Sequence, residues 1–85
     1  MSKYKDTITG DIIRFDCKYK FYNYRMQGRV LSVDKDVVSV KIEKAWLEIV
    51  GKWDIDWKCE LLGKEMKISK NKIKMNYRID RGEHE

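Results

Sequence analysis

The sequence contains few of the side chains on which catalysis usually depends. Its one histidine, His84, lies in a charged stretch near the end of the chain, where we expect it to be solvated. The glycine patterns of phosphate loops and dinucleotide-binding turns are absent. Asp54 and Asp56 fall on the polar side of an expected strand and are interpreted as a solvated face. The sequence therefore predicts a protein that is not an enzyme, with no catalytic residues and no cofactor.

Cysteine is also scarce. The two cysteines, Cys17 and Cys59, together with His84 are too few for the usual four-ligand zinc site, so no metal is expected. Both cysteines fall on the apolar side of an alternating segment. We therefore predict that they are buried, reduced thiols that react slowly while the protein is folded.

Long apolar runs are missing as well. No stretch of 18 apolar residues occurs, and residues 1–5 lack the apolar segment of a signal peptide. We expect a soluble, cytoplasmic protein that does not bind a membrane. A chain of 85 residues has room for one small domain, predicted at residues 1–81, followed by a flexible charged tail at 82–85.

What the sequence has in abundance is alternation of apolar and polar residues, the period of a β-strand with one buried face. Gly28 precedes a further apolar stretch at 30–33, residues 66–68 form a short strand, and polar clusters at 34–36 and 69–71 predict turns. The alternating segments are 13–21, 38–42, 53–61 and 73–79. The pattern predicts a mostly-β fold: a single small SH3-like (or OB-like) barrel of about five to six antiparallel strands.

Residues 43–50 do not fit this simple pattern. The apolar residues Ala45, Leu47 and Ile49 are out of phase with Ile42. Such a change of phase is produced either by a β-bulge or by a turn of helix, and both possibilities stay open from the sequence.

Four short segments resemble a known family. Gly10-Asp11-Ile12-Ile13-Arg14-Phe15 and Gly28-Arg29-Val30-Leu31-Ser32-Val33, followed by Val37-Val38-Ser39-Val40, are similar to the opening of KOW-type SH3-like barrels. Lys74-Met75-Asn76-Tyr77-Arg78-Ile79 resembles the last strand of small barrel proteins of Gram-positive bacteria and their phages. The abundance of lysine and isoleucine also favours an AT-rich genome, such as that of a low-GC Gram-positive bacterium or its phage. The resemblance covers about half of the chain and implies an RNA-binding or machinery-associated barrel.

The net charge of +5 is unevenly distributed along the chain. Residues 1–42 and 64–81 are basic, whereas 43–63 are acidic. Aromatic rings alternate with cations at residues 18–25, a combination that suits single-stranded RNA or DNA because rings stack on bases and cations meet phosphates. Tyr19 and Phe21 are expected in the core. The predicted nucleic-acid-binding residues are Lys18, Lys20, Tyr22, Tyr24 and Arg25, in a loop after the first strand, and Lys70, Lys72, Lys74 and Arg78 near the end.

Three tryptophans are many for so small an interior. Trp53 and Trp57 share a strand face and are expected mainly in the core, while Trp46 is out of that register. The alternative function is a protein-interaction module, such as a phage or mobile-element factor, that contacts a host protein through Trp46, Trp53 and Trp57. The oligomeric state is not determined by the sequence.

Overall fold

Three long strands form the centre of the sheet in the computed structural model, which describes residues 3–81. They are β1 (Ile12–Tyr19), β2 (Tyr22–Asp34) and β3 (Val37–Ile49), and each is antiparallel to the next. The turns between them are only two residues long. In the β1–β2 turn both Lys20 and Phe21 have positive φ, as in the turns that match the natural twist of a hairpin.

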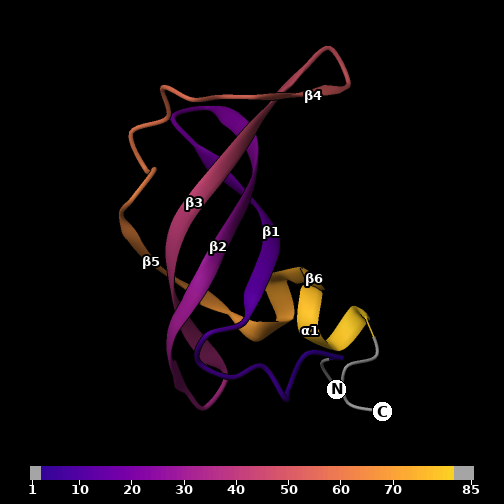
Figure 1. The fold of residues 1–85 in the computed structure, drawn as a ribbon. Coiled ribbons are helices and arrows are strands. Elements are labelled where there is room, and N and C mark those ends of the chain that lie inside the picture. Colours follow the sequence, from indigo (N-terminus) through magenta and orange to yellow (C-terminus); the bar gives the residue numbers. More distant parts are fainter. Residues whose placement is uncertain (1–2, 82–85) are drawn as a thin grey trace.

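Shorter elements complete the fold around these strands. They are β4 (Lys52–Ile55), β5 (Glu65–Ser69), the 3-10 helix η1 (Lys70–Lys72), β6 (Ile73–Asn76) and the short helix α1 (Tyr77–Asp80). The strand order is β4-β3-β2-β1-β6, and β5 pairs with the first half of β3. β4 and β5 pair with different parts of the same edge of β3, and the sheet curls into a half-barrel with α1 beside β6 (Figure 1). The predicted mostly-β small barrel of five to six antiparallel strands is confirmed.

The core lies on the inner side of this curled sheet. Alternate residues of the three long strands point into it, as the period of two requires. Ile13 and Phe15 of β1 pack with Met26 of β2, and all three are completely buried. The buried apolar residues are Tyr4, Ile13, Phe15, Tyr24, Met26, Val30, Val38, Val40, Ile42, Ala45, Cys59, Ile68 and Ile73.

A β-bulge explains the change of phase after Ile42. Gln27 of β2 lies opposite Lys44, whereas its neighbour Gly28 lies opposite Ile42, so Glu43 is an extra residue on β3. The bulge lets Ala45 return to the core side without ending the strand. Of the two possibilities for residues 43–50, the bulge is confirmed and the helical turn is wrong.

A buried polar network joins the N-terminal segment to the end of β6. Asn76 has no exposed surface, and its Nδ2 donates to Thr7 Oγ1 at 3.1 Å and to Asp11 Oδ2 at 2.9 Å. Its Oδ1 accepts from the N–H groups of Arg78 and Ile79, which caps α1. One side chain therefore holds residues nearly 70 positions apart in the sequence and starts the last helix.

Asp11 is the charged member of the network. Arg78 Nε donates to its Oδ1 at 2.7 Å, and the Ile8 N–H donates to its Oδ2 at 2.9 Å. Burial opposes the carboxylate, but the hydrogen bonds from Arg78, Asn76 and Ile8 outweigh it and hold the pKa of Asp11 below its ordinary value. The network is thus built around an ionised aspartate.

Several strand limits differ from the prediction. The first strand ends at Tyr19, and Phe21 stands fully exposed in the turn rather than in the core. Of the strand expected at 53–61, only the part in β4 is a strand, because the chain turns away after Ile55. It returns to β3 at Gly63, whose N–H donates to Ile42 O at 2.7 Å. The last strand ends at Asn76, where its side-chain cap begins α1 instead.

The two thiols are free, and their surroundings differ. Cys59 is buried, as predicted, whereas Cys17 is only partly buried, which corrects the expectation of full burial. Burial raises the pKa of Cys17, with smaller contributions from nearby Cys59 and Asp16. Trp57, also expected mainly in the core, is exposed because the strand ends before it.

Candidate nucleic-acid interface

The outer side of the sheet carries the side chains that alternate with the core set. Cross-strand pairing places Asp16, Arg25, Trp46 and Ile55 in one row across β1, β2, β3 and β4. The neighbouring rows contain Arg14, Gln27 and Lys44 on one side and Lys18 and Asn23 on the other, with Glu48 and Trp53 paired beyond them. Strand pairing therefore brings together residues that are widely separated in the sequence.

Arginines and aromatic rings stack on each other along this outer face. The Arg14 guanidinium lies 4.7 Å from the Trp46 ring centroid and 5.4 Å from that of Tyr77. The Arg25 guanidinium lies 4.5 Å from the Trp53 ring. These distances are within the range of cation–π attraction. The Arg81 guanidinium also lies over the Tyr77 ring, 5.6 Å from its centroid. We call the six residues Trp53, Arg25, Trp46, Arg14, Tyr77 and Arg81 the arginine–aromatic track.

Hydrogen bonds fix the two central arginines in place. Arg14 Nε donates to Gln27 Oε1 at 2.9 Å, and the Tyr77 hydroxyl donates to the same oxygen at 3.1 Å. Arg25 forms a two-pronged ion pair with Asp16, with 2.8 Å between Nε and Oδ1 and 3.3 Å between Nη2 and Oδ2. This ion pair raises the pKa of Arg25 still further. The guanidinium planes are thus held in a set orientation before any ligand arrives.

Shallow depressions with basic rims follow the track. One of about 350 Å³ lies beside Arg14, Tyr77 and Lys44, and a second of about 220 Å³ lies between Arg14, Arg25 and Lys74. The two share Arg14, so together they form a stretch of surface on which every charged side chain is a cation.

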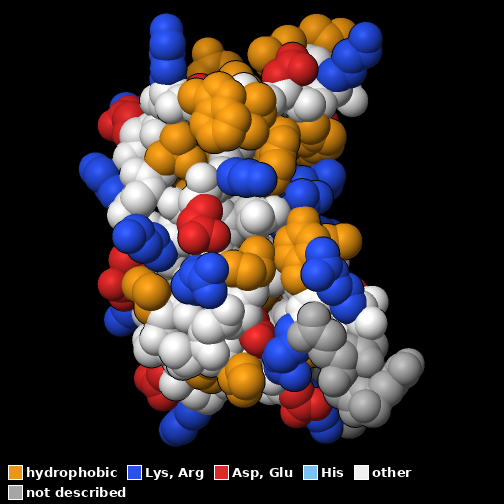
Figure 2. Space-filling model, in the orientation of Figure 1, with side chains coloured by type: hydrophobic (Ala, Val, Ile, Leu, Met, Phe, Trp, Pro, Cys, Tyr) orange, Lys and Arg blue, Asp and Glu red, His pale blue; other side chains and the backbone are white. Residues whose placement is uncertain are grey.

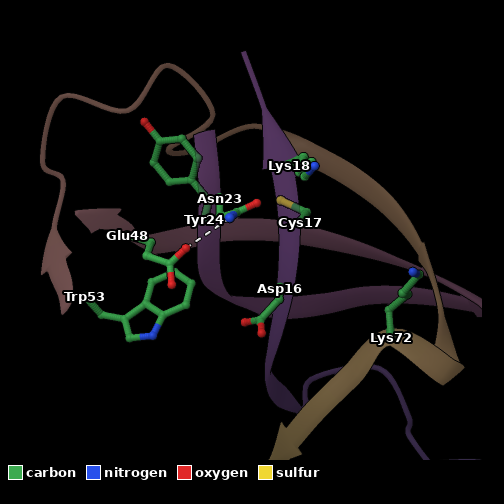
Figure 3. Close-up of a pocket in the computed structure, with 8 residues that line it drawn as sticks. All are labelled: Asp16, Cys17, Lys18, Asn23, Tyr24, Glu48, Trp53 and Lys72. Carbon is green, nitrogen blue, oxygen red and sulfur yellow. Dashed lines mark hydrogen bonds between the residues drawn. The ribbon is translucent and has the colours of Figure 1, made fainter. Parts of the chain in front are cut away.

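A third depression, of about 400 Å³, lies at the end of the track near β4 (Figure 3). Trp53 stands at one side of it and Lys72 of η1 at the other, with Asp16 between them. Its two acids are already engaged: Asp16 with Arg25, and Glu48 Oε1 with the Asn23 amide at 3.0 Å. The remaining charges, including Lys18, are positive.

The structure brings some of the predicted nucleic-acid-binding residues together on one face and places the others elsewhere. Lys18, Arg25 and Lys74 lie on the outer face, with Lys72 at its rim, beside Trp46 and Trp53. Residues predicted for two alternative surfaces therefore belong to one.

Two of the predicted contact residues are buried, which corrects the expectation that they are exposed. Tyr24 points into the core because the predicted loop is in fact the start of β2, and its hydroxyl donates to Asp56 Oδ2 at 2.9 Å. Burial and this hydrogen bond raise the pKa of Tyr24 to about 12. Lys70 is buried in η1, where its Nζ donates to Lys5 O at 3.0 Å.

The other predicted residues lie away from the track. Arg78 is ion-paired with Asp11 in the buried network, and Lys20 forms an exposed ion pair with Glu60. Tyr22 is exposed beside the β1–β2 turn, at the end of the sheet where the β3–β4 turn also lies.

Sequence reasoning missed Arg14, Tyr77, Arg81 and Lys44. Arg14 lies on the polar side of the first alternating segment, so its outward direction was detectable, but its aromatic neighbours were not. The alternation at 73–79 places Tyr77 on the apolar side of a strand, and only the change from strand to helix at Asn76 turns it toward Arg14.

Apolar side chains gather at one end of the molecule. Figure 2 shows them at the end where β4 lies. Phe21 and Val50, at the tips of two turns, are fully exposed. Both also have positive φ, which is unfavourable for residues with a side chain. This apolar end consists of Phe21, Tyr22, Ile49, Val50, Ile55 and Trp57.

Comparison of the chain with protein-family models, curated proteins and solved structures finds no match. Within residues 3–81, no three histidine, cysteine, aspartate or glutamate side chains come together in a group that could hold a metal ion. In the same part of the chain, no helix has both the length and the apolar character to cross a membrane.

Proposed function

We propose that this chain is a cytoplasmic, non-enzymatic module that binds single-stranded RNA or DNA along the arginine–aromatic track. The observation that carries the proposal is the stacking of Arg14 and Arg25 against tryptophan rings on a face whose nearby acids are already engaged. A single strand is bound by cations that meet its phosphates and by aromatic rings that stack on its bases, and this face carries both.

Each part of the face has a role in this proposal. Lys44 and Lys74 meet phosphates, and Lys18 and Lys72 continue the cationic surface on the side of the third depression opposite Trp53. Trp53 and Tyr77, whose rings are partly exposed, offer faces for base stacking at about 1–3 kcal/mol per base. Such contacts tolerate any base sequence, so we expect weak sequence preference and strong salt dependence.

The resemblance to KOW-type SH3-like barrels agrees with this proposal. Barrels of that type often bind RNA, which favours RNA over DNA as the natural ligand.

Titration of fluorescent single-stranded RNA and DNA at low and high salt tests the proposal. Lys44→Ala with Lys74→Ala should weaken binding to every sequence and lower the slope of log affinity against log salt by about 0.7 per lost contact. Trp53→Ala should weaken binding by about 1–3 kcal/mol.

The matched control is the double substitution Lys58→Ala with Lys64→Ala, which removes the same charge from exposed positions in the segment between β4 and β5. It should leave the salt slope nearly unchanged. Equal losses in both double variants would mean that net charge alone attracts the strand, and no binding at low salt would refute the proposal.

A second candidate function is protein interaction through the apolar end. The full exposure of Phe21 and Val50, together with that of Trp57, favours it, since aromatic residues dominate protein interfaces. The partner in this case is a host protein, and the chain a bacterial or phage-encoded factor that inhibits or redirects it. Its affinity would depend weakly on salt and would fall in Phe21→Ser.

A further inference from the structure

We propose that two copies of the chain join through the outer edge of β4 to form a symmetric dimer. In the sheet order β4 is the last strand of its path, so among the described residues no strand pairs with its outer edge. The edge is short, but Ile55 on it and Val50 and Trp57 at its two ends are exposed apolar residues. An open strand edge beside exposed apolar side chains is a ready template for pairing.

The β3–β4 turn determines which backbone groups face outward. Val50 and Gly51 both have positive φ, and the flanking residues Ile49 and Lys52 are paired, as in a two-residue hairpin. In such a hairpin the flanking pair exchanges both of its hydrogen bonds, and bonded pairs then alternate along the ladder. Lys52 and Asp54 therefore bond inward to β3, while the N–H and C=O groups of Trp53 and Ile55 point to the open edge.

The charges of β4 select one register among those that this alternation allows. With the two-fold axis at Trp53, each Trp53 bonds to the partner's Trp53, and Lys52 lies opposite the partner's Asp54. With the axis at Asp54, two aspartates would face each other, and Lys52 would lie opposite the partner's Asp56, a carboxylate that already accepts from the Tyr24 hydroxyl and the Lys58 N–H. With the axis at Ile55, Asp54 would face the partner's Asp56. Opposite charges across strands attract and like charges repel, so the Trp53 register, which has two attractive pairs and no like-charge pair, is the most favourable.

Both charged residues are available for this role. Lys52 and Asp54 are exposed, and neither forms an ion pair within residues 3–81 of the single chain. The pairs they form across the edge are non-hydrogen-bonded pairs, in which side chains approach most closely. The strand is thus complementary to itself in charge as well as in backbone groups, which identifies a second copy as the partner.

The dimer has a consequence for the outer face. A two-fold axis perpendicular to the sheet keeps the same face of both copies on one side, and the two Trp53 rings become cross-strand neighbours. The arginine–aromatic tracks of the two copies then meet at β4 and form one surface. The dimer itself rests on β4 alone and does not depend on the proposed binding of nucleic acid.

Charge exchange tests the inference. Sedimentation equilibrium over a range of protein concentrations, without nucleic acid, should show a monomer–dimer equilibrium for the wild-type chain. Lys52→Asp or Asp54→Lys should each weaken the dimer roughly tenfold, because either change converts two attractive cross-strand pairs into repulsive ones. The double variant with Lys52→Asp and Asp54→Lys restores opposite charges and should recover most of the dimer.

Lys35→Asp is the matched control, a charge reversal of an exposed lysine in the β2–β3 turn, outside the proposed interface, and it should leave the dimer unchanged. Thermal unfolding of each variant shows that it is folded. A wild-type chain that stays monomeric at every concentration would overturn the inference. So would a dimer that the single reversals do not weaken, or one that the double exchange does not recover, since its interface would lie elsewhere.

Discussion

Gly28→Ala should strongly destabilise the fold, although it adds only one methyl group. Gly28 lies at the bulge where β2 crosses close to β3. A Cβ at this position would meet the Lys41 carbonyl oxygen at 2.3 Å and Val40 Cγ1 at 2.4 Å. Both distances are far inside ordinary van der Waals contact, and the first partner is backbone. The new atom can be accommodated only if β2 and β3 separate.

The expected loss follows from this geometry. Overpacking of a core by a methyl group costs about 1–3 kcal/mol when side chains can adjust. Here the contacted carbonyl belongs to a paired strand, so we expect about 3 kcal/mol or more. For a domain of this size that corresponds to a fall in melting temperature of about 12 °C or more. The loss is a large share of the total, because small domains are stable by only about 5–15 kcal/mol.

Chemical and thermal unfolding measure the effect, with Gly63→Ala as the control. Gly63 has a φ of 80°, but an added Cβ there would have no atom within 4 Å, so its cost is backbone strain alone, about 1 kcal/mol. If the Cβ at Gly28 met no clash, alanine there would instead stabilise the strand by about 0.5–1 kcal/mol. A Gly28→Ala protein that is as stable as the wild type, or more stable, would show that the two strands do not approach so closely.

Three further predictions concern acid, thiols and a turn. Because the pKa of Asp11 is lowered in the folded protein, its contribution is complete above its ordinary value of 3.8 and is lost as the pH falls through the folded pKa. Urea unfolding at acidic pH should therefore show a shallower decline for Asp11→Asn than for wild type, and equal slopes would contradict the Arg78 contact. Native Cys17 should react slowly with a thiol reagent and Cys59 more slowly still, and fast labelling of Cys59 would place it outside the core. Val50→Asn should stabilise by about 1 kcal/mol in thermal unfolding, since asparagine tolerates the φ of 49° better than a β-branched residue, and a lower melting temperature would argue against this turn type.

The sequence predicted those features of the fold that depend on the alternation of apolar and polar residues along a strand. Ile13 and Phe15 face the core because one side of β1 must be buried, and the same period places Val38, Val40 and Ile42 correctly. Alternation carries no information about where a strand stops. Phe21 continues the apolar period of β1, yet the turn at residues 20–21 ends the strand just before it could become buried.

The candidate site was predictable only in part, because it depends on which strands are neighbours. The cations Lys18 and Arg25 were identified from local composition. Their meeting with Trp53 depends on the β3–β4 pairing, which has no local signature in the sequence. Tyr77 was beyond reach for a different reason: the cap formed by Asn76 is recognised only when Thr7 and Asp11 are seen to orient that side chain.

The link between Asn76 and the N-terminal segment determines when the protein can fold during its synthesis. Thr7 and Asp11 are synthesised 65 to 69 residues before their amide and guanidinium partners. Until then the Asp11 carboxylate must stay hydrated, because burying it without those donors would be costly. The hairpins of β1, β2 and β3 can form on the growing chain, but the half-barrel can close over Asp11 only after Arg78 has emerged. A translational pause before that codon would hold the protein open, with its core strands exposed to chaperones.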